Sequence, residues 1–100
     1  MIYITQLVFI KKGKESTFIE FEKWVLPLMK KYTGKMLYRI RPDKEAFISE
    51  TGELPYEIHF MSFDSDEKLS AFMSDPIRLN FIHLKEESIK STILVKGLKM

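Results

Sequence analysis

Residues 55–63 read Pro-Tyr-Glu-Ile-His-Phe-Met-Ser-Phe, and the fold is best deduced from this stretch. Aromatic and β-branched residues dominate it, and apolar side chains recur at alternate positions, which predicts a strand with one covered face. Thr51-Gly52, which precedes the stretch, has residue types typical of a hairpin turn. Asp64 and Glu67, which follow it, suit the N-cap and the third position of a helix. The sequence therefore predicts a strand that leaves a hairpin and leads into a helix.

The C-terminal third of the chain is predicted to hold helices and a last strand. The helix that begins after Asp64 is expected to bury Leu69, Phe72 and Met73. Asp75-Pro76 then ends it and begins a second helical segment, because proline is tolerated at a first helical position and aspartate caps it. Thr92–Val95 is rich in β-branched residues and is predicted to be the last strand.

Two more strands and a long helix are predicted on the N-terminal side of residue 55. The strands are Ile2–Ile10 and Lys35–Arg41, and residues 46–48 are expected to extend the second toward the hairpin. Between the two strands, apolar residues at three- and four-residue steps predict a helix over Glu15–Tyr32. Pro27 is expected to kink this helix without ending it.

The ends of this long helix also have recognisable signals. Thr17 and Glu20 are spaced as in a capping box near its beginning. Gly34 stands where a left-handed residue is expected to end it.

The order strand-helix-strand-strand-helix-strand predicts an α+β domain of ferredoxin-like βαββαβ architecture. Right-handed crossovers place its four strands in one antiparallel sheet, with the helices on one face. The chain has 100 residues and a mass of 11.9 kDa, so a single domain over residues 1–100 is expected.

Composition excludes several classes of site and protein. The chain has no cysteine, which rules out disulfides, thiol nucleophiles, thiolate zinc sites and iron–sulfur clusters. Residues 1–10 are apolar, but no basic region precedes them and Lys11 follows, so neither a signal peptide nor a membrane span is predicted. A cytoplasmic protein with no membrane partner is expected.

Alternation along the strands predicts which side chains face the helices. On the first strand we expect Ile2, Ile4 and Val8 to face them, and on the third strand Tyr56, Ile58 and Phe60. The uncovered face would then mix apolar and charged side chains, namely Tyr3, Thr5, Leu7, Phe9, Arg39, Arg41, Glu57, His59 and Met61. Because such a face is too apolar for water and too charged for a core, we expect a second copy to cover it in a homodimer. The alternative is an amphipathic exposed sheet with scattered surface ion pairs.

Three of these residues form a candidate catalytic set. His59 could act as a general base oriented by Glu57, and Arg39 could hold developing negative charge. The ligand would be a small aromatic or anionic organic molecule, contacted by Tyr3, Thr5, Tyr38, Arg41 and Met61. The alternative is a histidine hydrogen-bonded in a dimer cavity without turnover.

No cofactor and no metal are expected. His83 and Glu87 are four residues apart on a predicted helix and could present two metal ligands on one side. No third ligand stands at a recognisable spacing from them.

The sequence resembles the dimeric α+β barrel superfamily, which includes antibiotic-biosynthesis-type monooxygenases, EthD-like proteins and branches of unknown function. The similar residues span most of the chain: Phe21, Pro27-Leu28, residues 31–35, residues 55–59, Phe63-Asp64-Ser65, Phe72 and residues 75–78. The resemblance implies a homodimer with a pocket between sheet and helices in each subunit. If the protein is an enzyme, the resemblance implies cofactor-independent oxygenation or an isomerisation begun by proton removal.

Haem-degrading members of that superfamily use an asparagine on the first strand, a tryptophan on the sheet and a histidine on a late helix. Here the first strand offers Thr5 and Gln6, and Trp24 falls on the first helix. Haem degradation is therefore not expected.

Nucleic-acid binding is a third possibility that the sequence disfavours. Ile2–Leu7 looks like the first-strand motif of RNA-recognition domains, which share this strand order. The third strand lacks the basic-glycine-aromatic pattern of those domains, and Glu57 would repel phosphate. The preferred hypothesis is a homodimeric protein that binds a small organic molecule, as an enzyme or as a non-enzymatic ligand-binding or structural module.

Overall fold

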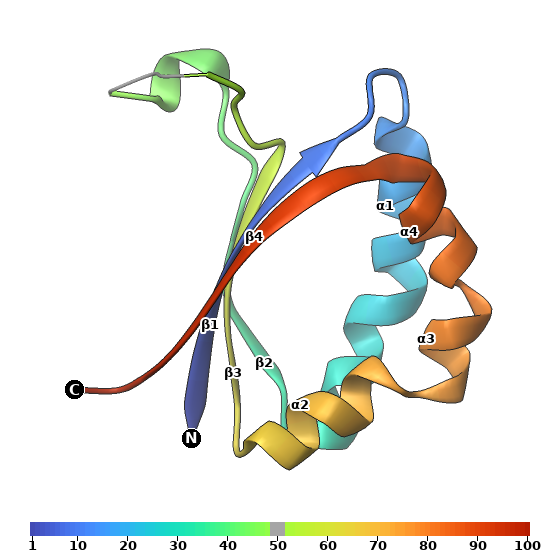
Figure 1. The fold of residues 1–100 in the computed structure, drawn as a ribbon, viewed down its shortest axis with the longest axis vertical. Helices are drawn as coiled ribbons and strands as arrows, with labels where there is room; N and C mark the ends of the chain where they lie inside the picture. Colours follow the sequence, from blue (N-terminus) through green and yellow to red (C-terminus); the bar gives the residue numbers. More distant parts are fainter. Residues whose placement is uncertain (49–51) are drawn as a thin grey trace.

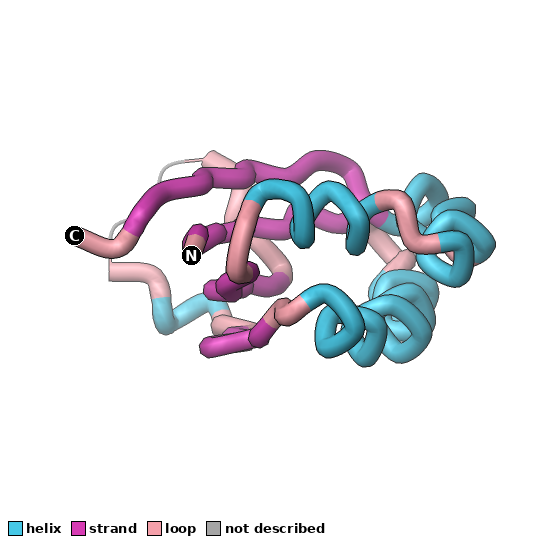
Figure 2. The backbone as a smooth tube through the Cα atoms, turned by 90° about the horizontal axis from the view of Figure 1, so that it is seen from below, coloured by secondary structure: helices cyan, strands magenta, loops and turns pink. Residues whose placement is uncertain are grey.

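A computed structural model describes residues 1–48 and 52–100 and confirms the predicted α+β fold. Four strands form one antiparallel sheet in the order β2-β3-β1-β4, and the helices of residues 15–32 and 66–88 lie on one side of it (Figures 1 and 2). The elements are β1 (Ile2–Ile10), α1 (Glu15–Val25), a 3₁₀ helix (Leu26–Tyr32), β2 (Lys35–Ile40), a 3₁₀ turn (Lys44–Ala46), β3 (Glu57–Phe63), α2 (Asp66–Met73), α3 (Pro76–Asn80), α4 (Ile82–Ser88) and β4 (Ile89–Leu98). None of the described helices has the length and apolar character needed to cross a membrane.

Strand β1 is central and pairs along its length with two neighbours. Ile2 lies opposite Phe63 of β3 and Leu98 of β4, so the beginning and the end of the chain lie side by side (Figure 1). Strand β4 is longer than predicted because its pairing with β1 continues well beyond Thr92–Val95.

Pro27 has a stronger effect than the expected kink. Helix α1 ends at Val25, and the chain continues as a 3₁₀ helix with Pro27 in its first turn. Proline has no backbone N–H to donate to the α-helical ladder, and the tighter 3₁₀ winding accommodates that loss.

The capping prediction for this first helix was wrong at both ends. The N-cap is Lys14, which makes no side-chain capping bond, so Thr17 and Glu20 form no capping box. At the other end Thr33, and not Gly34, adopts the left-handed conformation, with φ of 61°. Gly34 is required for a different reason: a Cβ there would lie 2.6 Å from Cε1 of the Phe63 ring.

Helix ends in the second half were predicted more accurately. Asp75 caps α3 by accepting hydrogen bonds from the backbone N–H groups of Ile77 and Arg78, as expected. The cap of α2 is Ser65 and not Asp64, one residue later than expected. Residues 46–48 form no strand, because the chain makes a 3₁₀ turn at Lys44–Ala46. Thr51 of the predicted hairpin lies outside the described residues.

The core lies between the sheet and the helices. Helix α1 and the 3₁₀ helix contribute Phe21, Val25, Leu28 and Met29, and β1 contributes Ile2 and Ile4 as predicted. Trp24, on the outer side of α1, stacks on Phe81 with ring centroids 5.0 Å apart. This stack links α1 to the segment between α3 and α4.

The predicted faces of β3 were reversed. Glu57, His59 and Met61 are buried on the helix side, with Glu57 1% and His59 4% exposed. Arg39 lies opposite His59 in the sheet and therefore points to the same side. An irregularity in β2 between Met36 and Tyr38 adds a residue there. The side chains that follow it therefore point to the opposite side of the sheet from the one that regular alternation predicts.

The uncovered face of the sheet is consequently apolar and carries no buried charge cluster in the part of the chain described. The rings of Tyr3, Phe60 and Tyr38 stack in a row across β1, β3 and β2, with centroid separations of 5.8 and 6.4 Å. Ile40 and Val95 are exposed beside this row. We call the surface formed by these five residues the aromatic face.

Candidate functional site

A cavity of about 140 Å³ lies between the sheet and the helices. Most of its wall is apolar and includes Ile4, Phe21, Met29, Met61, Phe63 and Phe72. Its polar side chains are Gln6, Glu22 and His59, together with Arg78, Lys85 and Thr92. An apolar cavity of about 150 Å³ can hold benzene, so this one is large enough for a single six-membered ring.

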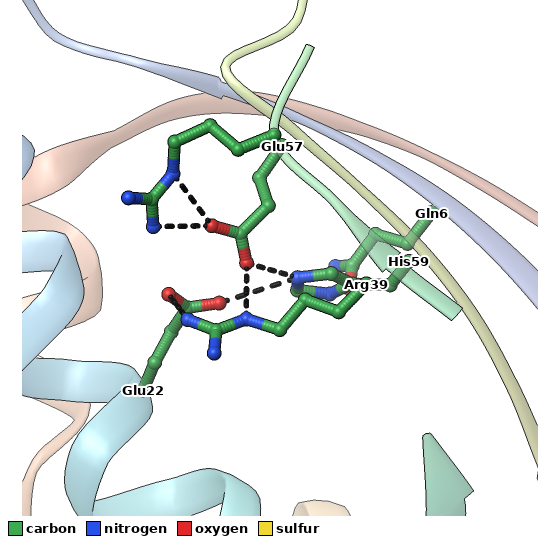
Figure 3. A network of polar contacts seen from close by, with 6 residues as sticks. Gln6, Glu22, Arg39, Glu57 and His59 are labelled. Atoms are coloured by element: carbon green, nitrogen blue, oxygen red, sulfur yellow. Dashed lines mark hydrogen bonds and ion pairs between the residues drawn. The ribbon is translucent and has the colours of Figure 1, made fainter. Parts of the chain in front are cut away.

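Behind one wall of the cavity, Glu57 is the centre of an ion-pair network. Its Oε1 accepts a hydrogen bond from Arg39 Nε at 2.8 Å, and its Oε2 accepts one from Arg41 Nη2 at 2.7 Å. Figure 3 shows Glu22 reaching from α1 toward Glu57, His59 and Arg39. The network therefore joins two strands of the sheet to the helix layer.

Glu22 has one oxygen in this network and one oxygen without a hydrogen bond. Arg39 Nη2 donates to its Oε1 at 2.6 Å. Its Oε2 lies 3.2 Å from His59 Nε2, but that nitrogen bonds to Glu57 Oε1 at 2.6 Å. Among the described residues Oε2 has no hydrogen-bond partner, although the Glu22 side chain is only 4% exposed.

Both ring nitrogens of His59 face an oxygen. Nε2 contacts Glu57, and Nδ1 lies 3.2 Å from Gln6 Oε1 on β1. Burial by itself would lower the pKa of His59, but the carboxylates of Glu22 and Glu57 close to its Nε2 outweigh that effect and raise the pKa. The arrangement suits an imidazolium that donates two hydrogen bonds.

The two carboxyl groups differ in their acidity. Burial raises the pKa of Glu22, and the adjacent Glu57 raises it further, against the effects of His59 and Arg39. Burial would also raise the pKa of Glu57, but its hydrogen bonds with His59 and the two arginines outweigh this and lower the pKa well below the usual range. Glu57 therefore stays ionised to a lower pH than Glu22, and Glu22 is the carboxyl group that takes up a proton more readily.

Glu22, Glu57 and His59 also form the one set of possible metal ligands in the described residues, with donor atoms within 4.8 Å of one another. Arg39 already binds an oxygen of each carboxylate. A metal ion would have to displace this guanidinium and lie beside Arg41, so the donor set fits an ion-pair network better than a metal centre. His83 and Glu87 are exposed on α4.

The structure brings together some of the predicted site residues and separates others. His59, Glu57, Arg39 and Arg41 are in direct contact, and Met61 lines the cavity. Tyr3, Thr5 and Tyr38 lie on the opposite side of the sheet, where Tyr3 and Thr5 line a shallow hollow with Phe60. The prediction of one site containing all eight residues was wrong, because the sheet lies between the two groups.

Five of the six polar cavity residues were missed as site residues, and two of the five, Glu22 and Gln6, had a signal in the sequence. Glu22 follows Phe18 by four residues and precedes Val25 by three, so an acid lies on the buried stripe of α1. Gln6 alternates with Ile4 and Val8 on the helix-facing side of β1. A polar residue at a position that the periodicity assigns to the core is the observation that could have identified each.

Comparison of the sequence with protein-family profiles and with curated proteins gives no match. Solved structures do match. A protein of unknown function from Rhodopseudomonas palustris has a TM-score of 0.82 at 13% identity, over 99% of this chain and 83% of that chain. A Dabb family protein with a ferredoxin-like fold from Mesorhizobium loti has a TM-score of 0.73 at 13% identity, over 99% of this chain and 96% of that chain.

A third matching structure is a dimeric protein of unknown function and ferredoxin-like fold from Bacteroides fragilis. Its TM-score is 0.68 at 13% identity, over 96% of this chain and 93% of that chain. Identities this low establish the architecture and leave the activity open. The resemblance to dimeric α+β barrel proteins is therefore confirmed at the level of the fold, which this chain shares with proteins of unknown function.

Proposed function

We propose that the cavity binds a small cyclic organic molecule and that Glu22 exchanges a proton with it. The observation that carries the proposal is Glu22 Oε2, a buried carboxyl oxygen at the cavity wall without a hydrogen bond from the described residues. Buried polar atoms are nearly always hydrogen-bonded, and an exception at a cavity is typical of a functional group.

The reaction class that fits this arrangement is an isomerisation begun by proton removal. The Glu22 carboxylate would take a proton from a carbon beside a carbonyl group, and the protonated Glu22 would return it to a second atom of the same molecule. Atoms and electrons balance without an oxidant. The raised pKa of Glu22 makes its carboxylate a stronger base than an exposed one.

The neighbouring residues support this role of Glu22. His59 lines the cavity and, as an imidazolium, would stabilise negative charge that develops on the ligand. Arg39 and Glu57 do not line the cavity and act as positioning residues through Glu22 and His59. The catalytic base is thus assigned to Glu22 rather than to His59, whose ring nitrogens are both engaged.

A non-enzymatic ligand-binding protein would have the same cavity, so the test must separate binding from turnover. The probe is cyclohexanone, a neutral carbon acid about the size of benzene. Binding is followed by NMR of ¹³C-labelled methionine methyl groups, because Met29, Met61 and Met73 line the cavity and Met1 and Met100 do not. Turnover is followed as deuterium exchange at the carbons beside the carbonyl in D₂O.

We expect cyclohexanone to shift the three cavity methyl signals. We also expect the hydrogens beside its carbonyl group to exchange for deuterium faster with the protein than without it. Glu22→Gln should reduce that exchange by about 100-fold. Glu67→Gln, which changes an exposed acid on α2, should not reduce it. Binding without accelerated exchange would favour the non-enzymatic alternative, and unchanged cavity methyl signals would contradict the proposal.

We further propose that two copies of the chain pair through the aromatic face. Tyr38 is 65% exposed and Val95 is 58% exposed, which is unusual for large apolar residues on one continuous surface. The Bacteroides fragilis protein of the same fold is dimeric. Pairing of two such sheets would remove these side chains from water.

A further inference from the structure

Arg78 is a buried cation at the cavity wall. It lies on α3, is 7% exposed and lines the cavity beside Phe21 and Phe72. Its guanidinium carbon lies 6.0 and 5.7 Å from the centres of those two rings. One nitrogen, Nη1, donates to the carbonyl oxygen of Met73 at 3.1 Å. The side chain is thus held in place mainly by aromatic packing and one backbone contact.

The remaining contacts of Arg78 leave its charge uncompensated. Its Nε is buried and has no hydrogen-bond partner, and no carboxylate forms an ion pair with it among residues 1–48 and 52–100. This differs from Arg39 and Arg41, which bind Glu57. A buried guanidinium normally has an anionic partner, because desolvation of an unpaired charge is unfavourable.

A second cation lines the same cavity. Lys85 extends from α4, and burial together with the positive charge of Arg78 lowers its pKa. The positive charges of Arg78 and Lys85 therefore interact unfavourably with each other. A ligand that carries a negative charge would relieve that repulsion and satisfy Nε of Arg78.

We propose that the cavity binds a six-membered-ring carboxylic acid as its anion, with the carboxylate held by Arg78 and Lys85. The ring would pack between Phe21 and Phe72, and the cavity volume of about 140 Å³ suits one ring. Glu22 repels a carboxylate, so the anionic end would lie toward Arg78 and the uncharged end toward Glu22. This inference rests on the proposed function, because it names the class of molecule that the same cavity takes.

The test compares two probes of nearly equal shape, benzoate and its neutral analogue benzamide. Their affinities are measured from the methyl signals of Met29, Met61 and Met73 in labelled protein, with Met1 and Met100 as internal references. For the unmodified protein we expect benzoate to bind at least about tenfold more tightly than benzamide, as a charge-assisted hydrogen bond allows. Phenyl phosphate, a third probe, has a larger anionic group and should bind more weakly than benzoate.

Variants then locate the anion site. Arg78→Met should remove the preference for benzoate while benzamide still binds, which also shows that the cavity has kept its shape. Lys85→Met should reduce the preference without abolishing it, and it offers a second variant if Arg78→Met does not fold. Lys30→Met, which removes an exposed cation outside the cavity, should leave both affinities unchanged.

The outcomes separate this inference from the proposed function. Equal affinities for benzoate and benzamide, or a benzoate preference that survives in both Arg78→Met and Lys85→Met, would overturn the anion site and leave the cavity as a binding site for neutral molecules. Tighter binding of phenyl phosphate than of benzoate would replace carboxylate by phosphate as the ligand class. If no probe shifts the cavity methyl signals, both proposals are wrong.

Discussion

Glu57 illustrates how a single side chain can stabilise the fold through charge. It is 1% exposed and binds Arg39, Arg41 and His59, so its loss leaves three donors without their common acceptor. We expect Glu57→Gln to lower the free energy of unfolding by about 3 kcal/mol. This is the lower end of the range of losses for breaking a buried ion pair, because both arginines are partly exposed. Urea denaturation at neutral pH measures this.

The matched control for that change is Glu53→Gln. Glu53 forms an ion pair with Lys90 at 3.0 Å, but both side chains are about half exposed. We expect a loss of less than about 1 kcal/mol, as for other surface pairs. Similar losses at the two positions would show that burial of the Glu57 network contributes nothing.

Glu22 gives the protein a characteristic pH dependence. Its native pKa is raised above the ordinary 4.5, so its contribution to stability is complete below pH 4.5 and is lost as pH rises through the native pKa. The raised pKa of His59 acts in the same direction above its ordinary 6.5. Glu57 acts oppositely, but only as pH falls below 4.5. We therefore expect the free energy of unfolding to decrease between pH 5 and 8.

Glu22→Gln should flatten the part of that curve above pH 4.5 that precedes the titration of His59, because the substituted amide does not titrate. Urea denaturation at a series of pH values measures the slope. Glu67→Gln should keep the original slope, since Glu67 is exposed. An unchanged slope in Glu22→Gln would mean that Glu22 titrates alike in the folded and unfolded chain.

At the scale of elements, the junction between the 3₁₀ helix and β2 depends on a close approach to β3. A methyl group at Gly34 would lie 2.6 Å from Cε1 and 2.9 Å from Cζ of Phe63, a ring that is fully buried. We expect Gly34→Ala to destabilise the protein by about 1–3 kcal/mol through overpacking. Thermal unfolding followed by circular dichroism measures the effect.

Gly97 on β4 provides the comparison, because a Cβ built there meets nothing within 4 Å. Gly97→Ala should therefore leave the melting temperature nearly unchanged or raise it slightly. If Gly34→Ala behaves in the same way, Phe63 moves aside at little cost and the close approach has no structural importance.

Element order and element type were predictable from the sequence because they depend on local periodicity and on turn residues. The strand at Ile2–Ile10 was predicted with its observed bounds, and Ile2, Ile4 and Val8 are buried as predicted. The orientation of β3 was not predictable by the same rule. Counting apolar residues places Tyr56, Ile58 and Phe60 inside, but the buried set is Glu57, His59 and Met61.

The reason for this failure is that charge pairing is non-local. Glu57 can be buried because Arg39, 18 residues away in the sequence, compensates its charge. His59 can be buried because Glu22, which lies on α1 and binds the same arginine, is close to its Nε2. Both faces of the sheet carry apolar side chains, and the alternation along a single strand cannot say which face the helices cover. Periodicity could have placed Glu22 on the buried stripe of α1, but its contacts with Arg39 and His59 follow only from the packing of α1 against the sheet.

The described residues form one layer of helices with an uncovered sheet face opposite them, and the proposed pairing of two copies is argued from this asymmetry. We expect sedimentation equilibrium to give a dimer at high micromolar concentration. Tyr38→Glu should shift it to the monomer, because the introduced carboxylate would lie within the buried aromatic face.

Leu79→Glu is the control for this experiment. Leu79 is 51% exposed on α3, in the helix layer and away from the aromatic face. This variant should remain dimeric. A monomeric unmodified protein, or a dimer that Tyr38→Glu leaves intact, would contradict pairing through the aromatic face.

Trp24 offers an optical signal that follows from its place on the outside of α1. It is the single tryptophan of the chain, and its indole lies flat against Phe81 with the planes 3° apart. Emission from this indole should therefore respond when α1 and the α3–α4 corner move apart, while changes on the far side of the sheet leave it untouched. Fluorescence lifetimes recorded during ligand titration would then show whether α1 and the α3–α4 corner move apart as a molecule enters the cavity.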